Sequence, residues 1–369
     1  MKLANRLLLT SAILVLSIGL LPAQQGAKGR KIGDFVLTNE AGCLEVLSQG
    51  RTGTCWSFAT TSWLESEVLR INGKKVDLSE MYVVRNAIGE KARRYVAADG
   101  KAVFGEGGLS HDVIAMVKEH GIVPIDQYTG LPNGGKRHSH GELFAMVKAV
   151  LGKIIEPKVK KRISPRWNGA IMAMVDSYLG APPKAVKTDK GSVSPQEYAT
   201  KVLKLPLGDY VEVMSYGATA FHEKAKLDVP DNWMHFSEYL NYPIDDLMAG
   251  LDAALEKGYT VAVDMDVSEP GFKTGKGVAR LPEKLEETGA VTQAVRDEMF
   301  KNGKTTDDHL MHTVGIARDA KGNKYYYTKN SWGTRAGPFG GYIFISENFM
   351  RAKILAIMVH KDALPKIKG

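Results

Sequence analysis

Apolar residues along the chain follow two periods, one typical of helices and the other of strands. Between Cys55 and about Ile71 the chain has no proline or glycine, and Trp56, Ala59 and Trp63 recur at intervals of three and four residues. This spacing predicts a helix that buries one face. The same spacing starts again at residue 244 and continues until a glycine at 258, which predicts a second amphipathic helix.

Strand patterns are concentrated in the last third of the chain. Runs of apolar and β-branched residues predict strands over 259–266, 309–316, 325–329 and 354–359. A glycine-containing turn over 318–324 joins the second and third of these strands, so we expect them to pair in an antiparallel hairpin.

Composition places the chain among globular proteins. Of its 369 residues, 44% are hydrophobic and 24% are charged, which excludes a disordered or fibrous protein. The first 23 residues differ, because Lys2 and Arg6 precede an apolar run over 7–21 and a small residue, Ala23. This pattern predicts a cleaved signal peptide over 1–23, and an uncleaved anchor is the alternative.

Signal cleavage would leave residues 24–369 as an exported protein, periplasmic or extracellular, with no stable membrane anchor. It removes two basic residues, so the net charge falls from +8 to +6. A basic segment over 153–166 contains prolines and lacks interleaved aromatic residues, which favours a solvated surface over a nucleic-acid site.

The chain contains only two cysteines, Cys43 and Cys55, and we expect both to be free. Cys55 follows Thr54, a suitable N-cap residue, at the start of the first predicted helix. A helix N-terminus lowers the pKa of a thiol and favours the nucleophilic thiolate. Gln49 lies six residues upstream across a glycine-rich turn, so its amide is a candidate to donate to an oxyanion together with the backbone N–H of Cys55.

A nucleophilic thiol needs a base, and the predicted hairpin supplies two candidates. The antiparallel pairing brings His309 close to Asn330, which follows the second strand. His312 competes as the base, but the alternation of side chains along a strand places it on the opposite face from His309. Only one of the two histidines is therefore expected to face the cleft.

Several motifs resemble those of papain-like cysteine peptidases. They are QGRTGTCW, DLSEMYVV, GEGGLSHDV, DDHLMHTVGIA and KNSWGT, in that order along the chain. In that family the histidine precedes a Val-Gly pair by five and six residues. Val314 and Gly315 stand at that spacing from His309, which favours His309 over His312.

The resemblance implies a role for each matched residue. Cys55 would be the nucleophile, His309 the base, Asn330 its orienting partner and Gln49 the oxyanion donor. The resemblance also implies that Trp332 shields the His309–Asn330 hydrogen bond. It further implies that the glycine pair Gly107 and Gly108 binds an extended substrate. It implies no metal and no organic cofactor.

Two departures from the compact papain pattern resemble the bleomycin hydrolase and aminopeptidase C branch. Thr52 stands where compact enzymes have a disulfide cysteine, and 254 residues separate Cys55 from His309, against roughly 130 to 150 in the compact type. The resemblance implies an α+β, two-lobed fold. Its parts would be a helical lobe with Cys55, a mostly helical insertion of about a hundred residues over 128–242, a β-rich lobe over 259–360 and a tail over 361–369.

This branch implies a peptidase that trims amino termini because its C-terminal tail occupies the cleft. The alternatives are a papain-like endopeptidase and a catalytically silent peptide-binding protein. A frayed terminus is the alternative for the tail. Peptides are the expected partners, and a homo-oligomer remains open.

Overall fold

The computed structural model describes residues 29–287, 289 and 291–365. The predicted signal peptide, 1–23, lies outside these residues and stays a prediction. Within the described ranges, no helix is long and apolar enough to cross a membrane.

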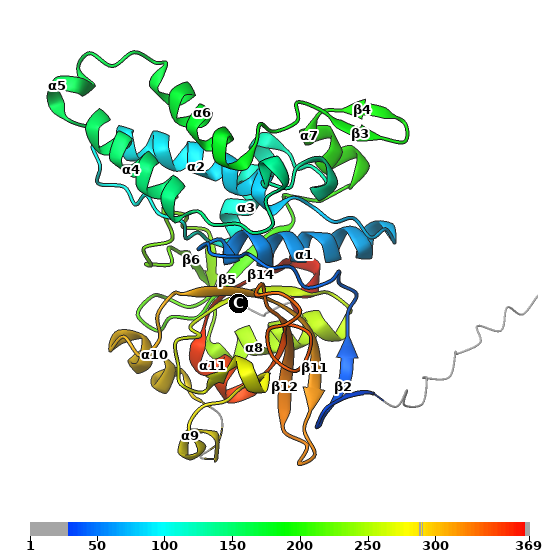
Figure 1. Cartoon of the computed structure of the whole chain (residues 1–369). Helices are drawn as coiled ribbons and strands as arrows, with labels where there is room; N and C mark the ends of the chain where they lie inside the picture. Colours follow the sequence, from blue (N-terminus) through cyan, green and yellow to red (C-terminus); the bar gives the residue numbers. More distant parts are fainter. Residues whose placement is uncertain (1–28, 288, 290, 366–369) are drawn as a thin grey trace, which may run out of the picture.

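Helices α2 to α7 gather on one side of α1, and the large sheet lies on its other side together with α8 to α11 (Figure 1). The helices are α1 (Cys55–Asn72), α2 (Glu80–Ala97), α3 (Ser110–His120), α4 (Gly141–Ile154), α5 (Pro157–Lys160), α6 (Trp167–Leu179), α7 (Pro195–Glu197), α8 (Ile244–Glu256), α9 (Glu283–Glu287), α10 (Gln293–Lys301) and α11 (Glu347–Lys353).

The large sheet has the strand order β6-β7-β5-β14-β8-β11-β12-β13-β10-β9, and β2 pairs with both β1 and β11. Its strands are β1 (Arg30–Ile32), β2 (Phe35–Glu40), β5 (Tyr210–Met214), β6 (Glu223–Ala225), β7 (Tyr239–Asn241), β8 (Val261–Met265), β9 (Phe272–Lys273), β10 (Val278–Ala279), β11 (His309–Arg318), β12 (Lys324–Lys329), β13 (Tyr342–Ser346) and β14 (Ile354–His360). A separate hairpin is formed by β3 (Val186–Thr188) and β4 (Gly191–Val193).

The predicted α+β fold with a helical and a β-rich lobe is confirmed. The four predicted strands correspond to β8, β11, β12 and β14, and β11 pairs with β12 in an antiparallel hairpin. The turn of this hairpin contains Gly322 at φ 85°, a backbone conformation that favours glycine. The two predicted helices correspond to α1 and α8.

Helix α1 is the element that joins the two lobes. It buries its residues from Cys55 to Val68 because the helical lobe covers one side and the sheet the other. Trp63 is completely buried, and its indole N–H donates to the carbonyl of Thr260, 2.9 Å away, just before β8. Packing against both lobes therefore fixes the position of α1.

The segment over 128–242 is helical in its first half and mixed in its second. Helices α4, α5 and α6 are followed by the β3–β4 hairpin, and β5 then joins the large sheet beside β14 (Figure 1). Pro157 is the first residue of α5, a position where the missing N–H of proline costs nothing. The size of an insertion relative to compact relatives stays a prediction.

The described part of the tail, 361–365, packs on the outside of α8. The Lys257 ammonium donates to the carbonyls of Asp362 and Ala363, and Ala363 is buried. Strand β14 pairs Ile354 with Met265, the residue opposite His309, so the tail leaves the sheet at the other end. These residues are neither frayed nor in the cleft, and 366–369 lie outside the described chain.

Candidate active site

The four predicted catalytic residues belong to four segments that meet at one end of β11. Cys55 is the first residue of α1, His309 is the first residue of β11, and Asn330 directly follows β12. The loop that contains Gln49 reaches this point as well, since the backbone N–H of Gln49 donates to the carbonyl of Ser331 at 2.9 Å.

His309 and Asn330 form a hydrogen bond whose direction the surrounding backbone determines. Asn330 Oδ1 lies 2.8 Å from His309 Nε2 and also accepts the backbone N–H of Ser331 at 2.7 Å. Because a backbone N–H only donates, this second bond identifies the Asn330 atom as the carbonyl oxygen. Nε2 must then carry the imidazole proton, which leaves Nδ1 with a free lone pair.

Trp332 lies against this histidine. The ring centroids of His309 and Trp332 are 4.8 Å apart with an interplanar angle of 34°, and Trp332 remains 37% exposed. His309 itself is buried. The indole thus lies between the His309 side chain and solvent on one side of the ring.

Cys55 is buried, and its environment acts against the predicted thiolate. Burial raises the pKa of the thiol to about 12, although the backbone N–H of Leu310, next to His309, lowers it. Burial also lowers the pKa of His309 to about 4. The prediction that the helix N-terminus lowers the Cys55 pKa is therefore wrong for this structure, because desolvation outweighs the dipole. Both groups are neutral at rest.

Thr54 occupies the N-cap position of α1 without capping the helix through its side chain. Its carbonyl accepts the backbone N–H of Ser57 at 3.0 Å, while its hydroxyl lies beside the hydroxyl of Thr52. The predicted helix start is correct, whereas the predicted side-chain cap is absent because the hydroxyl is engaged in the preceding turn.

The Gln49 amide is held at both ends. Its nitrogen donates one N–H to the carbonyl of Thr52 at 2.6 Å, and its oxygen accepts the hydroxyl of Ser331 at 2.6 Å. The Thr52 hydroxyl in turn donates to the carbonyl of Gln49 at 2.8 Å. An amide nitrogen has two N–H groups, so one remains to donate to another acceptor. The sequence alone does not reveal this role of Ser331, which depends on a contact between distant loops.

Gly107 and Gly108 lie in a loop that Lys91 and Trp56 hold in place. The buried Lys91 ammonium donates to the carbonyls of Gly105 and Gly107, and the Trp56 indole N–H donates to the carbonyl of Glu106 at 2.9 Å. A Cβ atom at Gly108 would lie 3.0 Å from the Trp56 ring. The loop is therefore anchored to the helix that carries Cys55.

His312 is not part of this arrangement. It is 1% exposed, and its Nδ1 lies 2.9 Å from the hydroxyl of Ser62, which also accepts the Lys329 ammonium at 2.8 Å. The structure thus brings His309 to Asn330 and directs His312 towards the interior of the molecule.

Comparison with known proteins identifies the family. The model of the Peptidase C1-like family matches residues 81–368. This chain belongs to that family. The matched range contains His309 and Asn330 and begins after Cys55. The predicted resemblance to papain-like cysteine peptidases is confirmed.

Named relatives of this Peptidase C1-like chain are aminopeptidases. Aminopeptidase G of Lactobacillus delbrueckii subsp. lactis is 23% identical over 371 residues, which cover 90% of this chain and 84% of that protein. Aminopeptidase E of Lactobacillus helveticus is 23% identical over 367 residues, which cover 89% of this chain and 84% of that protein. These matches confirm the resemblance to the aminopeptidase branch of the family.

The fold of this family member is also found in a solved structure. The crystal structure of PepW from Lactobacillus rhamnosis HN001 matches with a TM-score of 0.70 and 18% identity, over 89% of this chain and 83% of that chain. This similarity concerns the fold.

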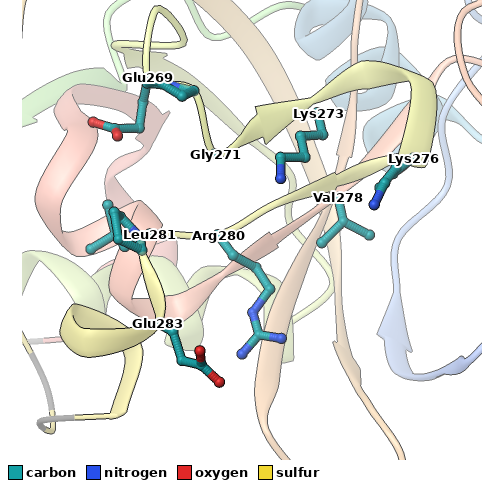
Figure 2. A pocket seen from close by; sticks show the side chains of 10 residues that line it. Glu269, Gly271, Lys273, Lys276, Val278, Arg280, Leu281 and Glu283 are labelled. Atoms are coloured by element: carbon teal, nitrogen blue, oxygen red, sulfur yellow. The ribbon is translucent and has the colours of Figure 1, made fainter.

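A hollow beside the β9–β10 hairpin lies outside the site of this Peptidase C1-like chain. Figure 2 shows Lys273 and Arg280 beside it, with Glu269 and Glu283 at its edge. None of the predicted site residues lines this hollow. The predicted catalytic residues therefore lie elsewhere, near the start of β11.

Proposed function

We propose that this chain is a cysteine aminopeptidase in which Cys55 attacks the carbonyl carbon of a peptide bond. The observation that carries the proposal is the His309–Asn330 pair, whose hydrogen bond leaves Nδ1 of His309 unprotonated. The backbone N–H of the next residue, Leu310, acts on the Cys55 thiol at the start of α1. The named aminopeptidase relatives support the trimming of amino termini.

The reaction begins from a neutral pair of side chains. His309 Nδ1 takes the proton of the Cys55 thiol while Sγ forms a bond to the carbonyl carbon of the substrate. The resulting imidazolium then gives this proton to the leaving amine as the C–N bond breaks, which produces a thioester. A water molecule, deprotonated by His309, hydrolyses the thioester and restores the thiol. Asn330 keeps the imidazole in the required tautomer throughout.

The negative charge on the substrate oxygen is stabilised by two N–H groups. One is the free N–H of the Gln49 amide. The other is the backbone N–H of Cys55, which has no partner within α1 because it is the first residue of that helix. Loss of one such donor typically lowers the chemical rate by roughly 10² to 10³. Trp332 limits the access of water to the His309–Asn330 bond.

The experiment compares a free hexapeptide with its N-acetylated form, with cleavage positions read by mass spectrometry. We expect the full-length protein to release residues from the free amino terminus and Cys55→Ala to release none. Cleavage of both peptides at internal bonds would identify an endopeptidase instead.

A thiol-directed epoxide separates an enzyme from a silent binding protein. Cys55 should react much faster than Cys43, which is half-buried and lies 3.2 Å from the Tyr342 hydroxyl. Because the same sample contains both thiols, Cys43 is an internal control. Equal labelling of the two, together with no cleavage, would reject the peptidase.

We also propose that residues 1–23 direct export. Sequencing of the mature amino terminus should then begin at Gln24, directly after Ala23. A mature chain that retains Lys2 would contradict this.

A further inference from the structure

Three carboxylates from separate elements lie close to one another near the start of β11. Asp231 lies between β6 and β7, Asp264 lies in β8, and Asp307 precedes β11. Asp264 and Asp231 both raise the pKa of the Cys55 thiol, and Asp231 and Asp264 both act on Asp307. The three groups therefore share one region next to the nucleophile.

Asp231 lies directly on Gly107. A Cβ atom added to Gly107 would be 2.0 Å from Asp231 Oδ2 and 2.5 Å from Oδ1. Such a distance is far shorter than any non-bonded contact, so only a glycine allows the carboxylate to approach the backbone here. Asp231 is half-buried, so part of this residue remains exposed to solvent.

Asp264 is buried, and its hydrogen-bonding neighbour is a second acid, Asp307. It is 4% exposed, and neither of its carboxylate oxygens accepts an N–H or hydroxyl group of a described residue. Asp307 lies close enough to raise the pKa of Asp264, and its own Oδ2 is also without a partner. Two ionised carboxylates have no proton to donate to each other, so this pair holds either one shared proton or a cation.

Neighbouring charges in the described chain do not neutralise this group. Lys91 attracts Asp231, but its ammonium is committed to the carbonyls of Gly105 and Gly107. Glu212 is paired with His111 at 2.9 Å. No lysine, arginine or histidine among the described residues forms a direct ion pair with any of the three aspartates.

The adjacent acids Asp266 and Asp308 are already satisfied. Asp266 accepts the backbone N–H groups of Ser268 and Thr306, and Asp308 accepts the backbone N–H of Val267. The unsatisfied acceptors are therefore those of Asp264 and Asp307, with Asp231 beside them.

We propose that Asp231, Asp264 and Asp307 bind the free α-ammonium group of the peptide substrate. This inference rests on the proposed peptidase function and names the part of the substrate that the site selects. In an amino-terminal residue, the ammonium nitrogen and the attacked carbonyl carbon share one α-carbon, so a receptor for the ammonium must lie beside the nucleophile. The three carboxylates meet this requirement, since they share the region next to Cys55.

Two further observations favour an ammonium over other occupants. No three His, Cys, Asp or Glu side chains in the described ranges are arranged to hold a metal ion. The described tail residues, 361–365, leave the sheet at the end opposite His309. Selection of a free amino terminus is therefore assigned to carboxylates within the body of the protein.

The first test compares Asp231→Asn with wild type on two coumarin amides, of alanine and of N-acetylalanine. A hydrogen bond to a charged group contributes about 1.5 to 3 kcal/mol, so kcat/KM for the free amide should fall roughly 10- to 100-fold. The value for the acetylated amide should change less than about threefold on the same scale. Asp228→Asn is the matched control, because Asp228 lies in the same segment but is 88% exposed.

A binding measurement keeps the test independent of turnover and of the proposed chemistry. In Cys55→Ala, calorimetry should find that tetraalanine binds roughly 10- to 100-fold more tightly than acetyl-tetraalanine. The added Asp231→Asn change should remove this difference. Asp264→Asn should have the same effect, and Asp231→Asn serves alone if the buried variant does not fold.

Three results would overturn the inference. The first is equal binding of the free and acetylated peptides. The second is an equal loss on both coumarin amides in Asp231→Asn. The third is an acetylated peptide that binds as tightly as the free peptide when its second residue is lysine, and only then. In that case the carboxylates would bind the lysine side chain instead of the amino terminus. If the protein binds free peptides selectively but cleaves none, the proposed peptidase function is rejected and the proposed ammonium-binding site is kept.

Discussion

His309 and His312 are three residues apart on β11 and have different partners. His309 contacts Asn330 and Trp332, whereas His312 is buried against Ser62. We expect His309→Ala to lower kcat/KM by roughly 10² to 10⁴, the usual contribution of a general base. His312→Ala should leave kcat/KM nearly unchanged.

The two variants should differ in stability in the reverse order. His312→Ala leaves a cavity and removes a buried hydrogen bond, which together cost about 2 to 3 kcal/mol of unfolding free energy. Denaturant unfolding of both proteins measures this cost. Loss of activity in a folded His312→Ala protein would contradict the assignment of His309 as the base.

The pH dependence of Cys55 alkylation tests the environment of His309. Burial lowers the pKa of His309 to about 4, while its bond to Asn330 acts in the opposite direction. The imidazole therefore stays neutral, and able to accept the thiol proton, until the pH falls through about 4. In a Cys43→Ser background, the rate of iodoacetamide reaction should persist to about pH 5 and decline below that. An acid limb near the ordinary histidine value of about 6.5 would indicate an exposed ring.

At the scale of elements, the loop before α1 and the loop after β12 act as one unit. The Ser331 hydroxyl donates to the Gln49 side chain, and the Gln49 backbone donates to Ser331. Ser331→Ala removes one of these bonds and should lower kcat about three- to tenfold, which corresponds to a net hydrogen bond. Ser331→Thr keeps a hydroxyl and should restore most of the rate.

A double-mutant cycle checks that Ser331 acts through Gln49. Gln49→Ala should lower kcat by roughly 10² to 10³. The double variant should be no slower than Gln49→Ala alone, because Ser331 then has no amide to orient. Additive losses would mean that Ser331 contributes independently of the Gln49 amide.

At the scale of the whole molecule, the site depends on how α1 sits against the sheet. Cys55 belongs to α1 and His309 to β11, so the nucleophile and the base are aligned only when the two lobes pack correctly. Trp63 contributes directly to this junction through its bond to Thr260 and its edge-on contact with Tyr210, at 4.6 Å between ring centroids.

Trp63→Phe should therefore lower both stability and kcat. It removes the indole N–H and part of the buried volume, at a cost of about 1 to 3 kcal/mol because the Thr260 carbonyl loses its partner. A shift of about 1 Å between Cys55 and His309 can reduce the rate by up to roughly 10²-fold. Trp167→Phe in α6 is the matched control and should leave kcat unchanged, since Trp167 is only partly buried and lies away from the junction. Equal effects of the two changes on kcat would contradict a role for the junction.

The amino-acid sequence by itself determined the elements that carry the site. The period of apolar residues placed the start of α1 at Cys55, and the turn around Gly322 predicted the hairpin that brings His309 towards Asn330. These features are local, because a helix or hairpin depends on side chains within a few residues of one another. Strands β6 and β7 escaped prediction because three residues are too few to display an alternation.

Only the tertiary structure decided the electrostatics of the site. Burial between the lobes raised the pKa of Cys55, although its position in α1 alone predicted the opposite. Asp231, Asp264 and Asp307 carry no shared motif, and they meet only because a loop, β8 and the start of β11 converge after folding. Desolvation and charge interactions depend on distances between residues that are remote in the chain, and those distances exist only after folding.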